Sequence, residues 1–122
     1  MITLAKTDLV VHPLCLGGNV FGFSADVAHS EDVLDYYFDH GGNFVDTADM
    51  YSQWAPGHVG GESETVIGNW MKRRGNRTKM VMATKVAKLD TRPGLKPANI
   101  AAACDDSLKR LKTDYIDLYY AH

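Results

Sequence analysis

Long hydrophobic runs are absent from this sequence of 122 residues, and no apolar stretch approaches the roughly 20 residues that a membrane-spanning helix needs. The first residues also lack the charged and then apolar layout of a signal peptide. Neither sign of charge is in large excess, because the net charge is −2 and the basic residues form only one short cluster, Lys72–Arg74. The sequence therefore argues against a membrane protein and a nucleic-acid-binding protein, and it predicts a cytoplasmic location.

Cysteine is scarce, with only two residues, Cys15 and Cys104. They lie far apart, one in a strand-like segment and the other on a predicted helix, without C-x-x-C spacing. We interpret both as reduced core residues, with a disulfide as the less favoured alternative. The five histidines show no metal-ligand spacing, so no metal site is predicted.

The sequence does contain an alternation of strand-like and helix-like segments, without a linker or a low-complexity stretch. The hydrophobic fraction of 45% is sufficient for a core in a chain of this length. After a short hairpin within residues 3–11, the predicted strands cover residues 13–16, 43–48, 80–86 and 115–122.

Helices are predicted between these strands. Ser30 looks like an N-cap ahead of two acidic residues, and Gly41 supplies the stop of the first helix. The second helix spans residues 62–74, with its acidic residues first and its bases last, as the helix dipole favours. Pro97 can open the third helix, whose predicted apolar stripe consists of Ile100, Cys104, Leu108 and Leu111.

Strands that alternate with helices form right-handed βαβ units and hence a parallel sheet. A flavodoxin-like open sheet would suit the length of the chain, but it needs a fifth strand and a last helix. An α/β barrel of the (β/α)8 TIM type needs roughly 250 residues. We favour this barrel, of which residues 1–122 would be an incomplete domain, supplying the N-terminal hairpin, strands 1–4 and helices 1–3.

Polar residues close three successive apolar runs: Asp46, Lys85 and His122. Because the carboxyl ends of parallel strands meet at one edge, these side chains are expected to converge there. Tyr51 follows Asp46 by five residues and would lie on the loop just beyond the same edge. The sequence therefore predicts a catalytic cluster of a carboxylate, a phenol, an ammonium group and an imidazole.

Four linked motifs resemble those of the aldo-keto reductases and together span essentially the whole chain. They are Gly42–Tyr51, Gly61–Glu64, Ala83–Val86, and the run Ser107–Leu111 that leads through Asp114–Tyr119 to His122. The resemblance implies a (β/α)8 barrel, NADP(H) as the cofactor, and reduction of aldehydes and ketones to alcohols.

Matched residue by residue, the catalytic residues of that family fall on Asp46, Tyr51, Lys85 and His122. The chemistry fits, because hydride transfer to a carbonyl carbon leaves negative charge on the oxygen, which then needs a proton donor. Tyr51 would be the donor, Lys85 would ease the loss of its proton, and Asp46 would hold Lys85 charged and oriented. His122 would hydrogen-bond the substrate oxygen.

The resemblance implies a cofactor site and a substrate pocket. Gly18 and Asn19, with Asp46, are expected to bind the cofactor, although Gly-Gly-Asn by itself more often marks a plain turn. Trp54 is expected to line the substrate pocket together with Tyr51 and His122.

Three other residues lie near this site in the sequence. Gln53 and His58 share the loop of Trp54, which in the family helps to wall the pocket. Asp49 could be mistaken for the catalytic acid, but it is expected to face solvent or to cap a turn.

In the family, strands five to eight carry the groups that bind the nicotinamide and the adenosine 2′-phosphate. The chain alone is therefore expected to be weakly active or inactive, and its two bare sheet edges invite self-association. The alternative hypothesis is a non-catalytic half-barrel or a regulatory subunit resembling the potassium-channel β subunits. The reductase hypothesis implies a small carbonyl compound as substrate, with neither nucleic acid nor membrane as a partner.

Overall fold

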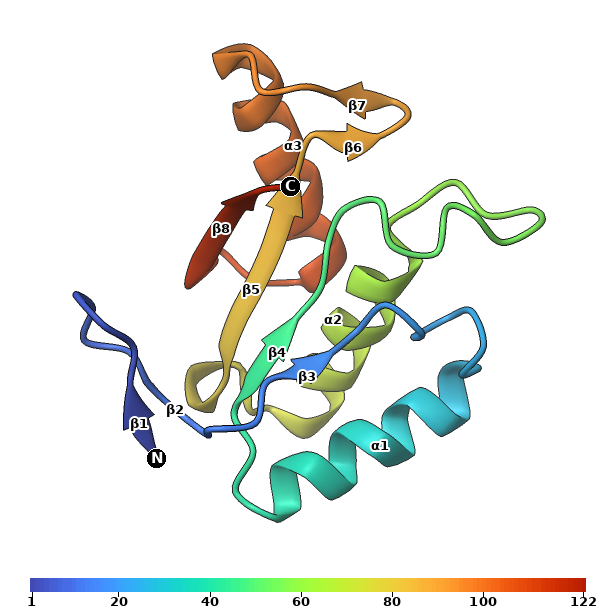
Figure 1. Ribbon diagram of the computed structural model, residues 1–122. Coiled ribbons are helices and arrows are strands. Elements are labelled where there is room, and N and C mark those ends of the chain that lie inside the picture. The colour runs from blue at the N-terminus through green and yellow to red at the C-terminus, as the bar shows by residue number, and fades with distance from the viewer.

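A parallel sheet of four strands forms the centre of the computed structural model, which describes residues 1–122 (Figure 1). Its strands, in order across the sheet, are β3 (Leu16–Gly17), β4 (Phe44–Asp46), β5 (Val81–Val86) and β8 (Leu118–Ala121). Every neighbouring pair is parallel, as predicted, although β3, β4 and β8 are shorter than the predicted strands. β5 is the longest and lies inside the sheet, as its near-continuous apolar sequence predicts.

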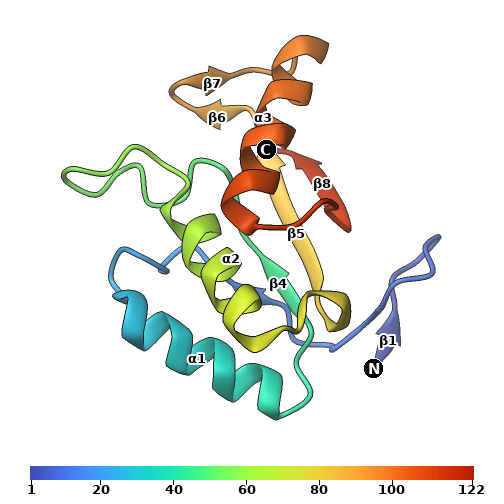
Figure 2. The ribbon, with the colours of Figure 1, turned by 180° about the vertical axis from the view of Figure 1, so that it is seen from behind.

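Helices cover one face of this sheet, as the views from the front and from behind show (Figure 1, Figure 2). They are α1 (Val27–Asp39), α2 (Glu62–Arg74) and α3 (Pro97–Leu111). The bounds of α2 and the start of α3 are those predicted, because the dipole-matched charges and the proline mark them in the sequence. None of the helices is long and apolar enough to cross a bilayer.

The core lies between the helices and the sheet, and its largest buried side chains include those of Trp70, Phe21, Leu34, Ile67 and Met82. Trp70 of α2 also donates its Nε1–H to Asp35 of α1 at 2.7 Å, so this large ring is both buried and hydrogen-bonded. α2 approaches α3 closely at Gly68, where an added Cβ would lie 2.2 Å from the carbonyl oxygen of Arg110.

Short elements complete the fold. β1 (Ile2–Thr3) and β2 (Val10–Val11) form the predicted N-terminal hairpin. A second hairpin, β6 (Lys88–Leu89) with β7 (Arg92–Pro93), and the 3₁₀-helix η1 (Arg77–Lys79) were not predicted. Elements of two or three residues show no hydrophobic periodicity, which is why the sequence does not reveal them.

The prediction that Ser30 caps the first helix is wrong. α1 begins at Val27, and its N-cap is Asp26, whose carboxylate accepts the backbone N–H of His29 at 2.8 Å. Ser30 is fully buried inside the helix, where its hydroxyl donates to the carbonyl oxygen of Ala25 at 3.1 Å. Both aspartate and serine can cap a helix, so the sequence is compatible with a helix that begins after Asp26 or after Ser30.

The apolar run of residues 13–16 predicts a buried first strand, and this prediction is wrong. Leu14 is 61% exposed and Cys15 is exposed, so the interpretation of Cys15 as a core residue fails. β3 lies at the edge of the sheet without a neighbour on its outer side, so the residues just before it remain uncovered. Both cysteines are free thiols, as predicted, and Cys104 is half-buried.

The buried face of α3 is rotated slightly from the predicted stripe. It consists of Ala103, Ser107 and Leu111. The predicted members Ile100, Cys104 and Leu108 are only half-buried. Small side chains at two of the three buried positions allow the helix to pack closely on its neighbours.

Candidate active site

The carboxyl ends of β4, β5 and β8 bring Asp46, Lys85 and His122 to one edge of the sheet, as predicted. Beyond β4 the chain runs on alongside β5, because the backbone N–H of Asp49 donates to the carbonyl oxygen of Lys85 at 3.2 Å. The chain then turns, and this turn places Tyr51 beside Lys85.

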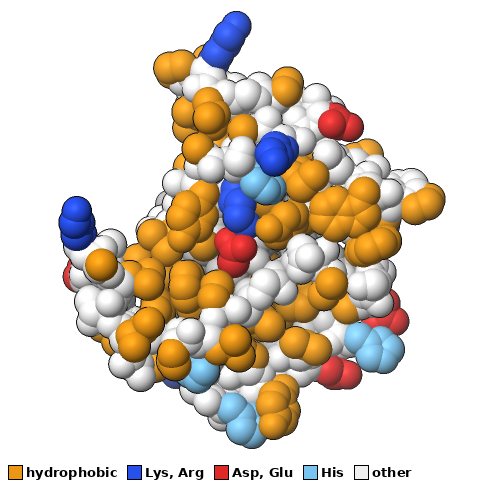
Figure 3. Space-filling view, viewed as in Figure 1, with side chains coloured by type: hydrophobic (Ala, Val, Ile, Leu, Met, Phe, Trp, Pro, Cys, Tyr) orange, Lys and Arg blue, Asp and Glu red, His pale blue; other side chains and the backbone are white.

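The face of the sheet that the helices leave open is hollowed and mostly apolar, with basic, acidic and histidine side chains gathered at its middle (Figure 3). A cavity of about 530 Å³ lies on this face. Its lining consists of Cys15, Phe44, Asp46, Lys85, Tyr120, Ala121 and His122. Three of the four predicted catalytic residues therefore line one space large enough for a small ligand.

Lys85 is the centre of the hydrogen-bond network at this edge. Its Nζ lies 2.8 Å from Asp46 Oδ2, 2.8 Å from the carbonyl oxygen of Thr47 and 2.9 Å from the hydroxyl oxygen of Tyr51. An ammonium group has three donors and no acceptor, so all three protons of Lys85 are engaged and the Tyr51 oxygen must accept. The hydroxyl proton of Tyr51 thus stays free to be donated elsewhere.

The network holds Lys85 in its charged form. Burial alone would lower the pKa of Lys85, but the hydrogen bonds that it donates to Asp46 and Tyr51 outweigh burial, and the pKa is raised above its usual value. The pKa of His122 is lowered, first by burial and then by the positive charges of Lys85 and Lys88. The site therefore pairs an ammonium group with an imidazole that is neutral at pH 7.

His122 completes the cluster beside Tyr51. The two rings lie 6.0 Å apart between centroids and meet edge to face. The backbone N–H of His122 donates to Val86 at the end of β5 at 2.9 Å, which fixes its position. Its Nδ1 is buried without a hydrogen-bond partner, so the imidazole keeps an unused polar atom in the site.

Trp54, predicted for the substrate pocket, lies next to the cluster. Its ring centroid is 6.0 Å from that of Tyr51 and 5.8 Å from that of Phe23, which it meets edge to face. Trp54 is 45% exposed and Phe23 is 49% exposed, so together they form an accessible aromatic corner. The sequence did not single out Phe23, because only the fold brings the loop after β3 against the loop after β4.

Gly18 and Asn19, predicted to bind the cofactor, follow β3 at the same edge. Gly18 is buried, donates its N–H to the carbonyl oxygen of Asp46 at 2.7 Å, and accepts the hydroxyl of Ser63 at 2.7 Å. An added Cβ would lie 3.0 Å from Ser63 Oγ and 3.1 Å from Asp46 O. This glycine therefore packs β3 against α2, while Asn19 is exposed and accessible to a ligand.

The expectation that Asp49 faces solvent or caps a turn is wrong. Asp49 is fully buried, and neither of its carboxyl oxygens has a hydrogen-bond partner. Burial, followed by the charge of Glu64, raises its pKa to about 6. The alternation of side chains between the two faces of an extended chain is the signal that indicates this burial. Asp46 points to the open face, whereas Thr47 and Asp49 point to the helices.

Glu64 is the second buried acid behind the site. It accepts the hydroxyl of Thr84 at 2.5 Å and the Nε–H of Arg110 at 2.6 Å, so its charge is compensated. Asp49 shares this wall but has no such partner.

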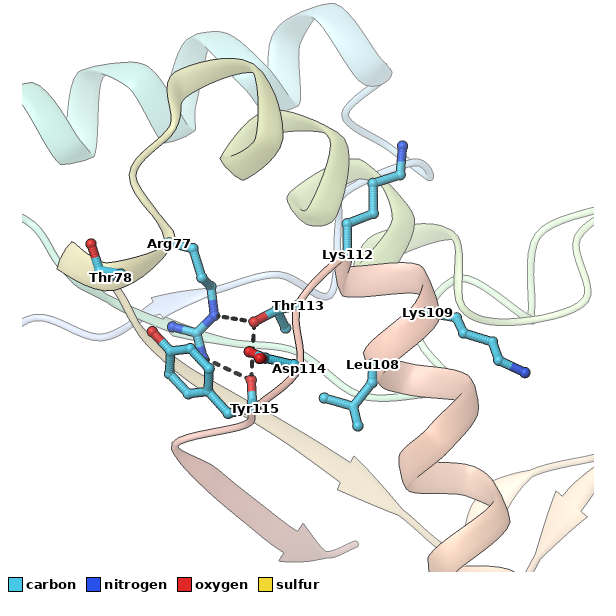
Figure 4. A pocket seen from close by; sticks show the side chains of 8 residues that line it. All are labelled: Arg77, Thr78, Leu108, Lys109, Lys112, Thr113, Asp114 and Tyr115. Atoms are coloured by element: carbon cyan, nitrogen blue, oxygen red, sulfur yellow. Dashed lines mark hydrogen bonds between the residues drawn. The ribbon is translucent and has the colours of Figure 1, made fainter.

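A second cavity, of about 580 Å³, lies at the opposite end of the sheet (Figure 4). Its lining consists of Arg77, Thr78, Leu108, Lys109, Lys112, Thr113, Asp114 and Tyr115. Arg77 already donates to Thr113 Oγ1, to the Tyr115 carbonyl oxygen and to Asp117, and it stacks 3.7 Å from the Tyr115 ring. Its guanidinium thus ties η1 to the segment between α3 and β8 and is not free for a ligand.

Comparison with known proteins identifies the family of this chain. Residues 13–122 match the Aldo/keto reductase family. Norsolorinic acid reductase B from Dothistroma septosporum is 37% identical over 137 aligned residues, which cover 98% of this chain and 33% of that protein.

Solved structures agree. A putative aldo-keto reductase from Pseudomonas aeruginosa superposes with a TM-score of 0.82 and 32% identity, covering 99% of this chain and 45% of that one. An aldo-keto reductase from Klebsiella pneumoniae in complex with NADPH gives a TM-score of 0.75 and 33% identity over 94% of this chain and 36% of that one. The chain thus spans less than half the length of these proteins, and its sheet and helices correspond to part of their (β/α)8 barrels, in agreement with the predicted fold class.

Proposed function

Because this chain belongs to the aldo/keto reductase family, an oxidoreductase lineage, we propose that it carries the catalytic residues of an NADP(H)-dependent reductase that converts aldehydes and ketones to alcohols. One observation carries the proposal. Lys85 Nζ lies 2.9 Å from the Tyr51 oxygen and 2.8 Å from Asp46, at the carboxyl edge of the sheet. The relatives give no support to the regulatory alternative.

Tyr51 is the proposed proton donor. Its oxygen accepts from Lys85 at 2.9 Å, so its own proton can point to a carbonyl oxygen in the cavity. As that proton leaves, negative charge grows on the phenol oxygen, and the ammonium group of Lys85 already faces it. Asp46 and the Thr47 carbonyl keep Lys85 in place without competing for the Tyr51 proton.

His122 is proposed to orient the substrate. A neutral imidazole can donate one hydrogen bond to a carbonyl oxygen without adding a second positive charge beside Lys85. The lowered pKa of His122 favours this neutral form at pH 7. Its ring meets the Tyr51 ring edge to face, so both side chains can hydrogen-bond to the same carbonyl oxygen of a substrate.

The donor set fits a nicotinamide cofactor, since a proton donor and a neutral imidazole meet beside an open apolar cavity of about 530 Å³. We propose that Gly18, Asn19 and Asp46 help to hold it at the edge of β3 and β4. A bound NADPH supplies the hydride. The NADPH complex of the Klebsiella pneumoniae relative supports this choice of cofactor.

The bare outer edges of β3 and β8 are proposed to accept the remaining strands of a barrel. The sheet has four strands, and the Pseudomonas aeruginosa structure extends well beyond the 45% that this chain matches. Unpaired strand edges present free N–H and C=O groups, so a second copy of the chain would bind there when no other strands do.

Fluorescence titration with NADPH, run beside size-exclusion chromatography, tests the proposal. The 122-residue chain is measured alone and after mixing with the C-terminal half of the Pseudomonas aeruginosa relative, and benzaldehyde reduction is followed at each step. Saturable micromolar binding and turnover in the mixture are expected. Neither binding nor turnover in a folded mixture would refute the cofactor and the reaction.

Trp54→Ala is expected to raise the KM for benzaldehyde about tenfold in an active mixture, with little change in kcat. The aromatic corner of Trp54 and Phe23 can stack on a flat ring, so the favoured substrates are aryl carbonyl compounds. Steady-state kinetics with benzaldehyde and propanal measure the effect. Val59→Ala, on the same loop and 75% exposed, serves as the matched control. An equal loss with both aldehydes would contradict the aromatic preference.

A further inference from the structure

The residue after Tyr51 has an unusual backbone conformation. Ser52 has a φ of 78°, in the left-handed region that favours glycine, and it is fully buried. A non-glycine residue persists there only when its surroundings enforce the conformation. Any relaxation of Ser52 would swing the adjacent Tyr51, so whatever holds Ser52 also sets the direction of the phenol.

His58 is the group that holds Ser52. Its Nδ1 lies 3.1 Å from Ser52 Oγ and 3.2 Å from the Ser52 carbonyl oxygen. A carbonyl oxygen only accepts, so Nδ1 carries the proton in this contact. The same carbonyl also accepts the N–H of Ala55 at 3.1 Å, and the N–H of His58 donates to Ala55 at 3.0 Å. The imidazole thus closes the loop 52–58 from within.

Ser52, His58 and Glu62 together resemble a hydrolytic triad by residue type, but their geometry forbids that chemistry. A triad uses both imidazole nitrogens, one toward the serine and one toward the carboxylate. Here the same Nδ1 faces Ser52 and lies 3.8 Å from Glu62 Oε1. Ser52 is also fully buried, so no substrate can reach its hydroxyl.

We propose that His58 is a positioning residue for Tyr51: through Nδ1–H it locks Ser52 in the left-handed conformation and so keeps the Tyr51 hydroxyl in contact with Lys85. Only the kinetic consequence of this role rests on the proposed reductase function. The positioning itself is a property of the chain and can be measured without turnover.

The outer side of the same loop is tied independently. Gln53 donates from Nε2 to the carbonyl oxygen of Lys88 at 3.3 Å, and its Oε1 accepts the N–H of Asp90 at 3.2 Å. Its amide thereby pairs with the β6–β7 hairpin that follows Lys85 on the chain. The loop of Tyr51 is held from inside by His58 and from outside by Gln53, so the loss of His58 alone is expected to reorient Ser52 without unfolding the loop.

Nuclear Overhauser contacts between the ring protons of Tyr51 and His122, whose centroids lie 6.0 Å apart, report the position of Tyr51 directly in the 122-residue chain. His58→Ala is expected to lower their intensity at least about twofold, because Ser52 is released. His58→Asn is expected to preserve it, because the asparagine Nδ2 replaces the donating Nδ1. His40→Ala removes a similar Nδ1 contact, 2.7 Å to the Tyr36 carbonyl oxygen on α1, and is the control.

Turnover gives the second readout. In an active mixture, His58→Ala is expected to lower kcat for carbonyl reduction on the order of tenfold with little change in the KM for NADPH, and His58→Asn to restore it. A Tyr51–His122 contact that survives in His58→Ala, or a His58→Asn variant as impaired as His58→Ala, would overturn the proposal. If no variant turns over while the contacts change as expected, the reductase function fails and the positioning role stands.

Discussion

Replacement of Tyr51 by phenylalanine is expected to lower kcat for carbonyl reduction on the order of 10³-fold in the assembled enzyme, with the Kd for NADPH nearly unchanged. The variant keeps the ring and its contacts with Trp54 and His122 but loses the only free hydroxyl proton of the cluster. Lys85 retains Asp46 and the Thr47 carbonyl, so the network does not collapse.

Single-turnover kinetics and a fluorescence titration on the same preparation separate these two effects. Tyr36→Phe is the matched control, because Tyr36 is 69% exposed on α1 and neither lines the 530 Å³ cavity nor bonds to the cluster. Turnover that persists in Tyr51→Phe would remove Tyr51 from the chemistry and leave His122 as the candidate donor. A parallel loss of NADPH binding would instead assign Tyr51 to the cofactor site.

The cluster could be predicted from the sequence because its geometry follows from a simple rule. Asp46, Lys85 and His122 each lie within one residue of the carboxyl end of a strand, and parallel pairing brings those ends to one edge, since Asp46 pairs with Ala83 and Val86 pairs with Ala121. No detailed knowledge of side-chain packing is needed to predict that three such residues lie at one edge of the sheet. The helix 62–74 was equally predictable, because its charges and its final glycine mark both of its ends.

Contacts between loops could not be predicted in the same way. Phe23 contacts Trp54 only because the fold brings the loops after β3 and β4 together, and no local sequence pattern encodes that contact. The left-handed Ser52 was hidden for a related reason. Glycine is the residue that signals this conformation, whereas here a serine adopts it with the help of His58 six residues later.

The burial of Asp49 does not follow from its residue type but from its position in the alternation of side chains along the strand. Aspartate is nearly always exposed unless it is paired, and the sequence shows no partner nearby. The backbone nonetheless continues beside β5 as far as Asp49, which turns the side chain toward the buried Glu64 of α2. Because successive side chains of an extended chain point to opposite faces, the side chain of Asp49 lies on the face covered by the helices, whatever its polarity.

This burial leads to a prediction about stability. The change that Asp49→Asn makes in the free energy of unfolding is expected to be more favourable at pH 8 than at pH 4 by about 2.5 kcal/mol, since the pKa of Asp49 rises from 3.8 to about 6 on folding. Between those two values the folded state holds a proton that the unfolded state has lost, so the stability of the parent falls as the pH rises. Above pH 6 the folded chain carries the full penalty of a buried, unpaired carboxylate.

Urea unfolding of both proteins at pH 4, 6 and 8 measures this difference. The buried asparagine amide also needs hydrogen bonds, and their absence has its own effect on stability. Because an amide does not titrate, that effect is the same at every pH, and only the change between pH values reports the charge of Asp49. Asp8→Asn, at an exposed position, is the control and should show no such change. A difference between Asp49→Asn and the parent that stays constant from pH 4 to pH 8 would mean that Asp49 is ionised and compensated in the folded chain. Arg110, whose charge lowers the pKa of Asp49 and which also bonds to Glu64, would then be the compensating cation.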